Sequence, residues 1–205
     1  MSNKKQIIYV GGGNAFEKKE DFYEYLKEYE LDPYDKNKRW TRELPVILED
    51  KFDYFKIEMP SKDEADYIAW KIWFEKYLKF LNDKETILMG YSQGGTFLLK
   101  YLSENLFPKR VKQIHLIAPF VKENNFEKYK LMNFKFDLSK INRINEICDD
   151  VHIWYSSDDF LVLPDNSEIV IKNIPKIVIH KFDDRNHFFQ EAFPELLEVI
   201  NKSIL

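Results

Sequence analysis

The sequence contains a single cysteine, Cys148, among 205 residues. One thiol cannot form an intrachain disulfide, which excludes the small secreted proteins that depend on a disulfide framework. Cys148 also lacks the basic neighbours that stabilise a thiolate nucleophile, so we expect a buried structural thiol.

An excess of one charge sign and long apolar runs are absent as well. The 31 Lys and Arg residues face 35 Asp and Glu residues, which gives a net charge of −4. No basic block stands out, so electrostatic binding to nucleic acid is not indicated. No apolar run approaches the ~18 residues of a membrane span, and the first run is too short for a signal peptide. We therefore expect a cytoplasmic protein without a membrane span.

Glycine is rare, and all six glycines fall in two clusters, GGG at 11–13 and GYSQGG at 90–95. A chain that uses so little glycine places it where φ is positive or where the backbone approaches another group closely. The second cluster has the pattern G-x-S-x-G, follows the apolar run 86–89 and precedes helical i, i+3, i+4, i+7 spacing over 95–102. A strand, a sharp turn with serine at its apex and a helix together predict a nucleophile elbow.

Short apolar runs alternate with helical patterns along the chain. The runs cover residues 6–10, 52–59, 86–89, 111–118, 151–155 and 176–182. Helical spacing also occurs at Phe22, Tyr25, Leu26 and Tyr29, at Ala65, Ile68, Ala69 and Ile72, and at Phe193, Leu196, Leu197 and Ile200. This alternation predicts one α/β domain over residues 1–205, with a doubly wound, mostly parallel sheet of about six strands.

Two segments have weaker patterns. Residues 31–48 contain Pro33 and Pro45, and we expect them to wrap irregularly from the first helix to the second strand. Residues 120–142 follow the fourth run, where folds of this class often insert a cap. Their short length allows a small lid at most, so we expect an open or lightly covered site.

A serine hydroxyl needs a base, a group that orients the base, and donors for an oxyanion. In hydrolases with a nucleophile elbow these groups follow successive strands in the order Ser, acid, His. Here Ser92 follows the third run, SSDD at 156–159 follows the fifth, and DDRNH at 183–187 follows the sixth. His187 is therefore the predicted base, and both Asp158 and Asp159 fit the role of the acid.

The remaining histidines and acids have structural interpretations. His115 lies in mid-strand and is expected in the core, and His152 and His180 lie at strand ends without a partner pattern. Asp183 and Asp184 are expected to shape the loop or to face solvent.

The two glycine clusters supply the expected oxyanion donors. These are the backbone N–H of Gln93 and one N–H from Gly12 or Gly13, each contributing ~3 kcal/mol to the transition state. A nucleotide-binding interpretation of the first cluster fails, because Phe16 occupies the last glycine position of G-x-G-x-x-G and no Walker A loop is present. Metal-ligand spacings are absent too, so neither a cofactor nor a metal is predicted.

These residues together resemble a family of small, largely capless α/β-hydrolases that includes the retinoblastoma-binding serine hydrolase of animals and many bacterial relatives. The similarity rests on YVGGG at 9–13, GYSQGG at 90–95, SDD at 157–159 and FDDRNHF at 182–188. The resemblance implies Asp159, the second residue of the Asp-Asp pair, as the acid. The chain departs from the family at Tyr91, where histidine is common, and after Asp159, where the family's first proline is missing.

The predicted function is hydrolysis of an ester, or of a thioester or amide, through an acyl-enzyme on Ser92. A small or medium acyl substrate is favoured because no large lid is available. Aromatic residues that could line its pocket are Trp40, Trp70, Trp73, Phe120 and Phe160. Two alternatives are a binding or scaffold protein with this fold, and acyl transfer to an acceptor other than water.

Overall fold

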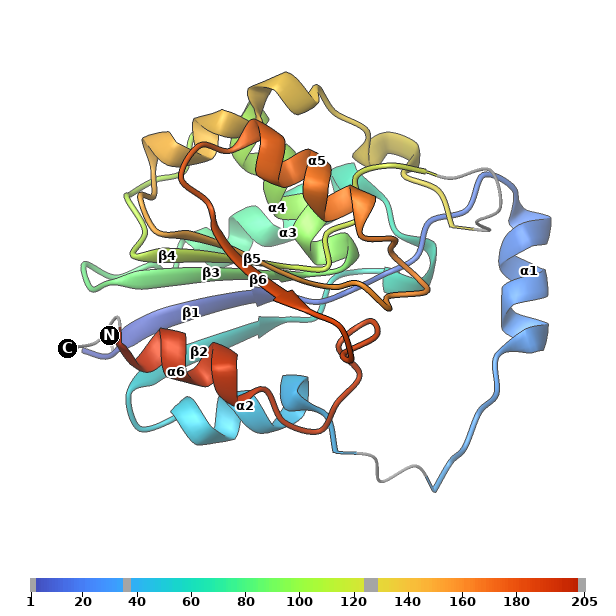
Figure 1. The fold of residues 1–205 in the computed structure, drawn as a ribbon, viewed down its shortest axis with the longest axis horizontal. Helices are drawn as coiled ribbons and strands as arrows, with labels where there is room; N and C mark the ends of the chain where they lie inside the picture. The colour runs from blue at the N-terminus through green and yellow to red at the C-terminus, as the bar shows by residue number, and fades with distance from the viewer. Residues whose placement is uncertain (1–2, 35–37, 124–128, 203–205) are drawn as a thin grey trace.

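The computed structural model describes residues 3–34, 38–123 and 129–202, which are built around a six-stranded sheet (Figure 1). The strands are β1 (Lys5–Val10), β2 (Phe52–Ile57), β3 (Thr86–Tyr91), β4 (Gln113–Ile117), β5 (Val151–Ser156) and β6 (Val178–Phe182). Every pairing is parallel, and the order is β2-β1-β3-β4-β5-β6. Each predicted apolar run coincides with one strand, so the doubly wound parallel sheet is confirmed.

Helices cover both faces of the sheet. They are α1 (Lys19–Glu28), α2 (Trp40–Leu48), α3 (Tyr67–Leu78), α4 (Gln93–Glu104), α5 (Asp165–Asn173) and α6 (Pro194–Lys202), with 3₁₀ segments η1 (Lys62–Glu64), η2 (Met132–Phe134) and η3 (Leu138–Glu146). Helices α2 and α6 lie on one face, and α3, α4 and α5 lie on the other (Figure 1). Two apolar cores result, one on each side of the sheet. Because both faces are covered, the inner strands β1, β3, β4 and β5 are almost fully buried, whereas the edge strands β2 and β6 are partly exposed and contain charged residues.

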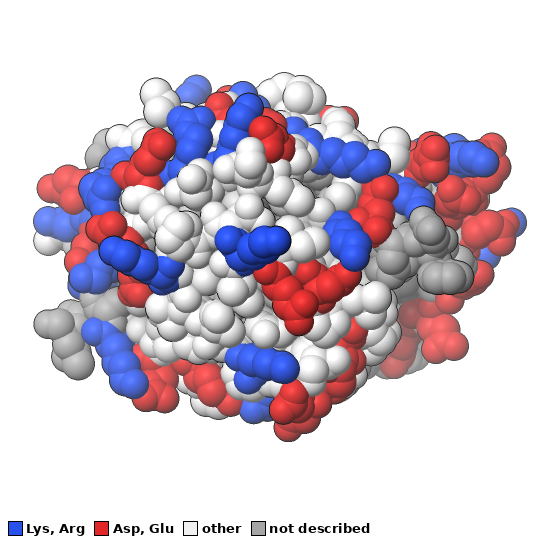
Figure 2. Space-filling view, turned by 45° about the horizontal axis from the view of Figure 1, so that its top comes forward, with Lys and Arg blue, Asp and Glu red and all other residues white. Residues whose placement is uncertain are grey.

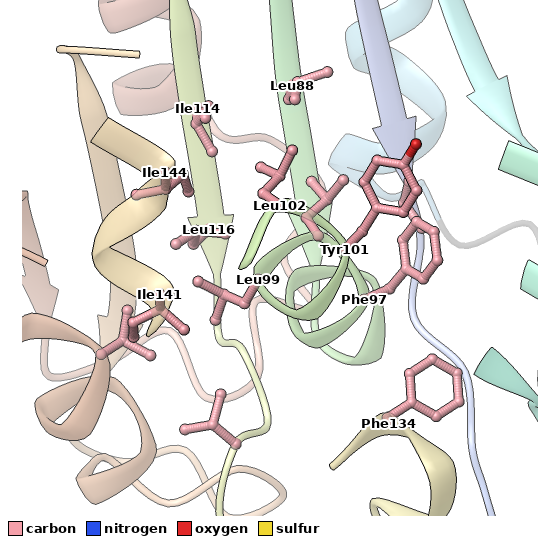
Figure 3. Packing of buried hydrophobic residues seen from close by; sticks show 14 of the residues in the cluster. Leu88, Phe97, Leu99, Tyr101, Leu102, Ile114, Leu116, Phe134, Ile141 and Ile144 are labelled. Carbon is pink, nitrogen blue, oxygen red and sulfur yellow. The ribbon is translucent and has the colours of Figure 1, made fainter. Parts of the chain in front are cut away.

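Helix α4 is the most deeply buried helix, and its residues from Gln93 to Ser103 are all buried. Figure 3 shows why: Leu99 and Leu102 face Leu88 and Leu116 of the sheet, and η3 covers the helix from outside. The helix predicted from Gly95, Leu98, Leu99 and Leu102 is therefore confirmed. This burial fixes the first turn of α4, and with it the position of Ser92 just before the helix.

Helix α3 forms where the spacing predicted a helix, but the isoleucines of that spacing do not lie in the core. Ile68 and Ile72 are 54% and 55% exposed, whereas Tyr67, Trp70 and Phe74 are buried and contact Phe97 of α4. Apolar residues surround this helix, so spacing alone selects no single face. The larger rings bury more apolar area and so occupy the core side.

Helix α1 forms where its spacing predicted a helix, whereas the segment that follows it differs from the prediction. Helix α1 has no buried residue and stands beside the carboxyl ends of the strands, away from both helical layers (Figure 1). Its rings at Phe22 and Tyr25 contact Phe16 instead of the sheet. Segment 31–48, predicted to be irregular, contains α2. This helix continues through Pro45, and its apolar residues Trp40, Leu44 and Leu48 are buried.

No inserted cap is apparent between β4 and β5 in the described residues. Residues 129–150 form η2, η3 and their connections, and η2 and η3 pack on α4 rather than over the strand ends. Residues 124–128 of the predicted lid segment lie outside the described residues. The expectation of little or no cap is confirmed.

Three histidines form a stacked polar cluster on the α6 side of the sheet. His115 accepts a hydrogen bond at Nδ1 from Trp154 Nε1 at 3.2 Å, as expected of a satisfied core residue. His152 Nδ1 and His180 Nε2 are 3.0 Å apart, and His152 Nε2 is 2.9 Å from Asp150 Oδ1. His152 and His180 therefore do have partners, which their isolated sequence positions did not indicate.

This cluster predicts that acid destabilises the protein. Burial lowers the pKa of His115 and His152 below 6.5 and that of His180 to about 4, although Asp150 opposes the shift at His152 and His180. Between pH 6.5 and these lowered pKa values the unfolded chain binds protons that the folded chain does not. The free energy of unfolding therefore decreases as the pH is lowered. One pKa unit corresponds to about 1.36 kcal/mol, and the contribution of His180 is smaller because its side chain is partly open to solvent. We expect the free energy of unfolding to decrease by about 2 kcal/mol from pH 7 to pH 5.

Urea unfolding at several pH values measures this loss. A free energy of unfolding that stays constant or rises between pH 7 and pH 5 would contradict the prediction. The same titration with His180→Gln should show a smaller slope over this range, because one of the titrating groups is then removed.

Candidate active site

Ser92 lies in a strained turn between β3 and α4. Its φ is 54° and its ψ is −124°, in a region that residues with a Cβ atom rarely occupy. A Cβ atom at Gly90 would lie 2.7 Å from the carbonyl oxygen of Gly94, and one at Gly94 would lie 2.1 Å from the carbonyl oxygen of Val10. None of the six glycines, all in the described part, has a positive φ. Close backbone approach therefore explains these two glycines.

The glycine loop after β1 lies directly against Ser92. A Cβ atom at Gly12 would be 3.4 Å from Ser92 Cβ and 3.8 Å from Ser92 Oγ. Gly13 packs instead against the carbonyl of Lys62, at 2.6 Å from its Cβ position. Gln93 is the first residue of α4, and first-turn amides of a helix have no intrahelical partner. Of the two loop glycines predicted to supply a donor, Gly12 therefore lies against Ser92, whereas Gly13 packs against Lys62 and Trp70.

His187 and Asp159 form a buried pair. The distance from His187 Nδ1 to Asp159 Oδ2 is 2.8 Å, and the two residues are 4% and 3% exposed. The other carboxylate oxygen of Asp159 accepts hydrogen bonds from the amides of Leu161 and Val162, each at 2.9 Å. A carboxylate fixed in this way favours the tautomer with the proton on Nδ1, which leaves Nε2 free to accept one.

Asp158 performs a different task from Asp159. Its Oδ1 accepts hydrogen bonds from the Ser156 hydroxyl at 2.5 Å and from the Asn186 amide at 2.9 Å. The Ser156 hydroxyl, followed by backbone amides, lowers the pKa of Asp158. Of the two acids left open by the residue pattern, the structure brings Asp159 to His187, and Asp158 ties strand β5 to the loop that carries His187.

The loop that carries His187 has left-handed backbone on both sides of the histidine. Asn186 has a φ of 47° and Phe188 a φ of 56°, and positive values are rare for bulky residues. Asp183 accepts a hydrogen bond from Ser157, and Asp184 is paired with Arg185, so both shape this loop as expected.

A cavity of about 220 Å³ opens beside Ser92 and His187. Five of the six predicted site residues line it, namely Gly12, Gly13, Ser92, Gln93 and His187, and Asp159 lies behind His187. The other lining residues are Asn14, Ala15, Lys62, Asp63, Tyr91, Phe120, Tyr129, Lys130, Leu161 and Val162. Sequence reasoning missed most of these, although Leu161 and Val162 lie only two and three residues after the acid.

Of the aromatic residues considered for the pocket, only Phe120 lines this cavity. Trp40 and Trp70 are core residues, whereas Trp73 and Phe160 are 39% and 65% exposed. A second cavity of about 270 Å³ adjoins the first and shares Gly12, Lys62 and Tyr91 with it. Its other walls include Tyr9, Thr41, Lys56 and Glu58, so it is more polar than the first.

Other features of the described residues bear on what can bind. No group of three or more His, Cys, Asp or Glu side chains in residues 3–34, 38–123 and 129–202 is arranged to hold a metal ion. Within the same ranges, no helix has the length and apolar character that crossing a bilayer requires. On the face seen in Figure 2, basic and acidic side chains are interspersed around uncharged surface. Cys148 is buried, which raises the pKa of its thiol to about 12, as expected of a structural cysteine.

Comparison with known proteins identifies the fold. A sequence profile described as alpha/beta hydrolase fold matches residues 54–137. The ydeN gene product of B. subtilis is similar in structure, with a TM-score of 0.71 and 18% identity over 98% of this chain and 99% of that chain. A YdeN-like hydrolase from Pectobacterium atrosepticum has a TM-score of 0.61 and 13% identity, over 98% of this chain and 91% of that one.

A third structural neighbour matches over a similar share of the chain. Est1E of Butyrivibrio proteoclasticus, solved with ferulic acid bound, has a TM-score of 0.58 and 12% identity over 98% of this chain and 88% of that chain. These identities are too low to transfer an activity, but they agree on the arrangement of strands and helices. Together with the parallel sheet and the turn at Ser92, they show that this chain forms a single α/β-hydrolase domain.

Proposed function

We propose that this protein is a serine hydrolase that cleaves a small or medium ester through an acyl-enzyme on Ser92. The observation that carries the proposal is the buried contact of 2.8 Å between His187 and Asp159, in a pair whose histidine lines the same cavity as Ser92. A serine at a strained elbow, a histidine and a buried carboxylate that orients it are the groups that acyl transfer requires.

Each group has a definite role in the proposed reaction. Ser92 Oγ attacks the ester carbonyl while His187 Nε2 removes its proton, and Asp159 stabilises the imidazolium that results. The amides of Gln93 and of Gly12 or Gly13 donate hydrogen bonds to the oxyanion of the tetrahedral intermediate. Collapse of this intermediate breaks the ester C–O bond, and His187 protonates the departing alcohol. Water then attacks the acyl-enzyme by the same route and regenerates Ser92.

The two cavities suggest how an ester would lie. The first is walled by Ala15, Phe120, Leu161 and Val162, which suit a short apolar acyl group. The second presents Thr41, Lys56 and Glu58, which suit a polar leaving group. Thioesters and amides can use the same groups, but an ester is favoured by structural neighbours described as an esterase and as a lipase-esterase related protein.

We also propose that the chain belongs to the family of small hydrolases that it resembles in sequence. The four shared motifs support this proposal, as does a fold similar in extent to the YdeN structures. The Asp-Asp pair supports it further, because the family's choice of the second aspartate agrees with the contact between Asp159 and His187.

Intact-mass measurement after treatment with a fluorophosphonate probe tests the proposal. We expect one adduct on the wild-type protein and none on Ser92→Ala, because only an activated serine attacks the probe rapidly. Absence of an adduct on folded wild-type protein would reject the hydrolase and favour a binding protein. Product analysis with added alcohol or amine would then distinguish hydrolysis from acyl transfer in a protein that does react.

A further inference from the structure

We infer that Tyr91 positions His187, so that the residue next to the nucleophile also holds the general base in place. Tyr91 is the last residue of β3 and directly precedes Ser92. Its hydroxyl donates a hydrogen bond to the backbone carbonyl oxygen of His187 at 2.6 Å. The inference rests on the proposed function, because it assigns Tyr91 a role in the reaction proposed there.

Two contacts make Tyr91 a direct link between the two loops. The rings of Tyr91 and His187 have centroids 5.2 Å apart and are tilted by 39°, so the phenol also limits the rotation of the imidazole. The backbone next to Tyr91 is itself fixed, since the Ser92 amide donates to the Ile117 carbonyl at 2.8 Å. The separation of Ser92 and His187 is thereby set by one rigid aromatic side chain anchored in the sheet.

A second aromatic donor completes this attachment. Trp40, at the start of α2, donates from Nε1 to the carbonyl oxygen of Phe188 at 2.9 Å. The rings of Trp40 and Tyr91 meet edge to face with centroids 5.8 Å apart. Two consecutive carbonyls, those of His187 and Phe188, are therefore held by two side chains that touch each other.

The local backbone explains why such an attachment is needed. Phe188, directly after His187, has a φ of 56°, which costs a bulky residue roughly 1–3 kcal/mol, and Asn186 before it also has a positive φ. Without external partners the loop would relax to an ordinary conformation and carry the imidazole away from Ser92. Burial raises the pKa of Tyr91, and nearby Asp159 raises it further, so the phenol stays protonated as a donor across the working pH range.

Tyr91→Phe separates positioning from packing, because it removes the hydroxyl and keeps the ring. With a small chromogenic ester we expect kcat to fall about 10- to 100-fold, the scale of a misplacement of roughly 1 Å, while KM changes less than about threefold. The proton between His187 and Asp159 gives an independent signal in the downfield ¹H NMR spectrum, and we expect it to shift or broaden in the variant.

Tyr101→Phe is the matched control. It removes the phenol of another buried tyrosine, in α4 and outside the cavity, and we expect wild-type kcat and an unchanged NMR signal. Trp40→Phe should reproduce the kcat loss and the NMR change of Tyr91→Phe, because it removes the other donor.

The readouts keep this inference distinct from the proposed function. Wild-type kcat together with an unchanged downfield proton in Tyr91→Phe would overturn it, and so would an equal loss in Tyr101→Phe. If the wild-type protein neither reacts with the probe nor cleaves esters, the proposed function fails. The NMR comparison of wild type and Tyr91→Phe would still show whether Tyr91 orients His187.

Discussion

Replacing Asp159 with Asn should lower kcat for ester hydrolysis by about 10⁴-fold, with little change in KM. Asp159 Oδ2 lies 2.8 Å from His187 Nδ1 and accepts its proton in a hydrogen bond. An Asn amide nitrogen in the place of Oδ2 cannot accept this proton. The imidazole then favours the tautomer with its proton on Nε2, which cannot act as a base toward Ser92. Steady-state kinetics with a small ester measure the effect, and circular dichroism checks that the variant is folded.

Asp158→Asn is the matched control, because it makes the same chemical change at the adjacent residue. Asp158 accepts hydrogen bonds from Ser156 and Asn186 at the base of the loop, and no contact with His187 is found among the described residues. We expect its kcat to fall by less than about tenfold, through a small shift of the loop. The opposite ranking of the two variants would show that Asp158, and not Asp159, orients the base.

The residue pattern did not determine which of these two aspartates is the acid. Their order along the chain placed a carboxylate after the fifth strand, but adjacent side chains point in different directions there. Only the turn after Ser156, which directs Asp159 toward His187 and Asp158 toward Asn186, separates them. The resemblance to known hydrolases selected Asp159 without explaining why.

The sheet was easier to predict than the helices around it. The four inner strands are mostly apolar because both of their faces are covered, and the edge strands β2 and β6 still keep short apolar runs, so all six could be located from the local sequence pattern. The glycines of 90–95 were equally informative, since their spacing around Ser92 is the pattern of a sharp turn between a strand and a helix. Both signals are local, because they depend on residues next to each other in sequence.

The face that a helix buries depends on distant partners, and the spacing that located the helices did not reveal it. In α3, apolar residues surround the helix, and only packing against Phe97 and Phe134 selects Trp70 for the core. Helix α1 has correct spacing but no layer to pack on. The contact between Tyr91 and His187 spans 96 residues and has no signature in either segment.

Gly94→Ala should cost most of the folding stability, about 4 kcal/mol or more. A Cβ atom there would lie 2.1 Å from the carbonyl oxygen of Val10 and 2.5 Å from that of Gly11. Both are backbone atoms, and Val10 belongs to β1 in the middle of the sheet, so neither can rotate away. Alanine would gain about 1 kcal/mol in helix propensity, which is too little to offset separation of β1 from α4. Urea unfolding of the purified variant measures the loss.

Gly11→Ala tests whether close approach, rather than loss of any glycine, causes this effect. Its Cβ would lie 3.6 Å from the Tyr9 ring, an ordinary contact, and we expect stability within about 0.5 kcal/mol of wild type. If Gly94→Ala folds with normal stability, the glycine loop must have moved away from α4. Such a variant should still lose esterase activity, because Gly12 then no longer lies against Ser92. A stable and fully active Gly94→Ala protein would contradict both the packing and the proposed oxyanion donors.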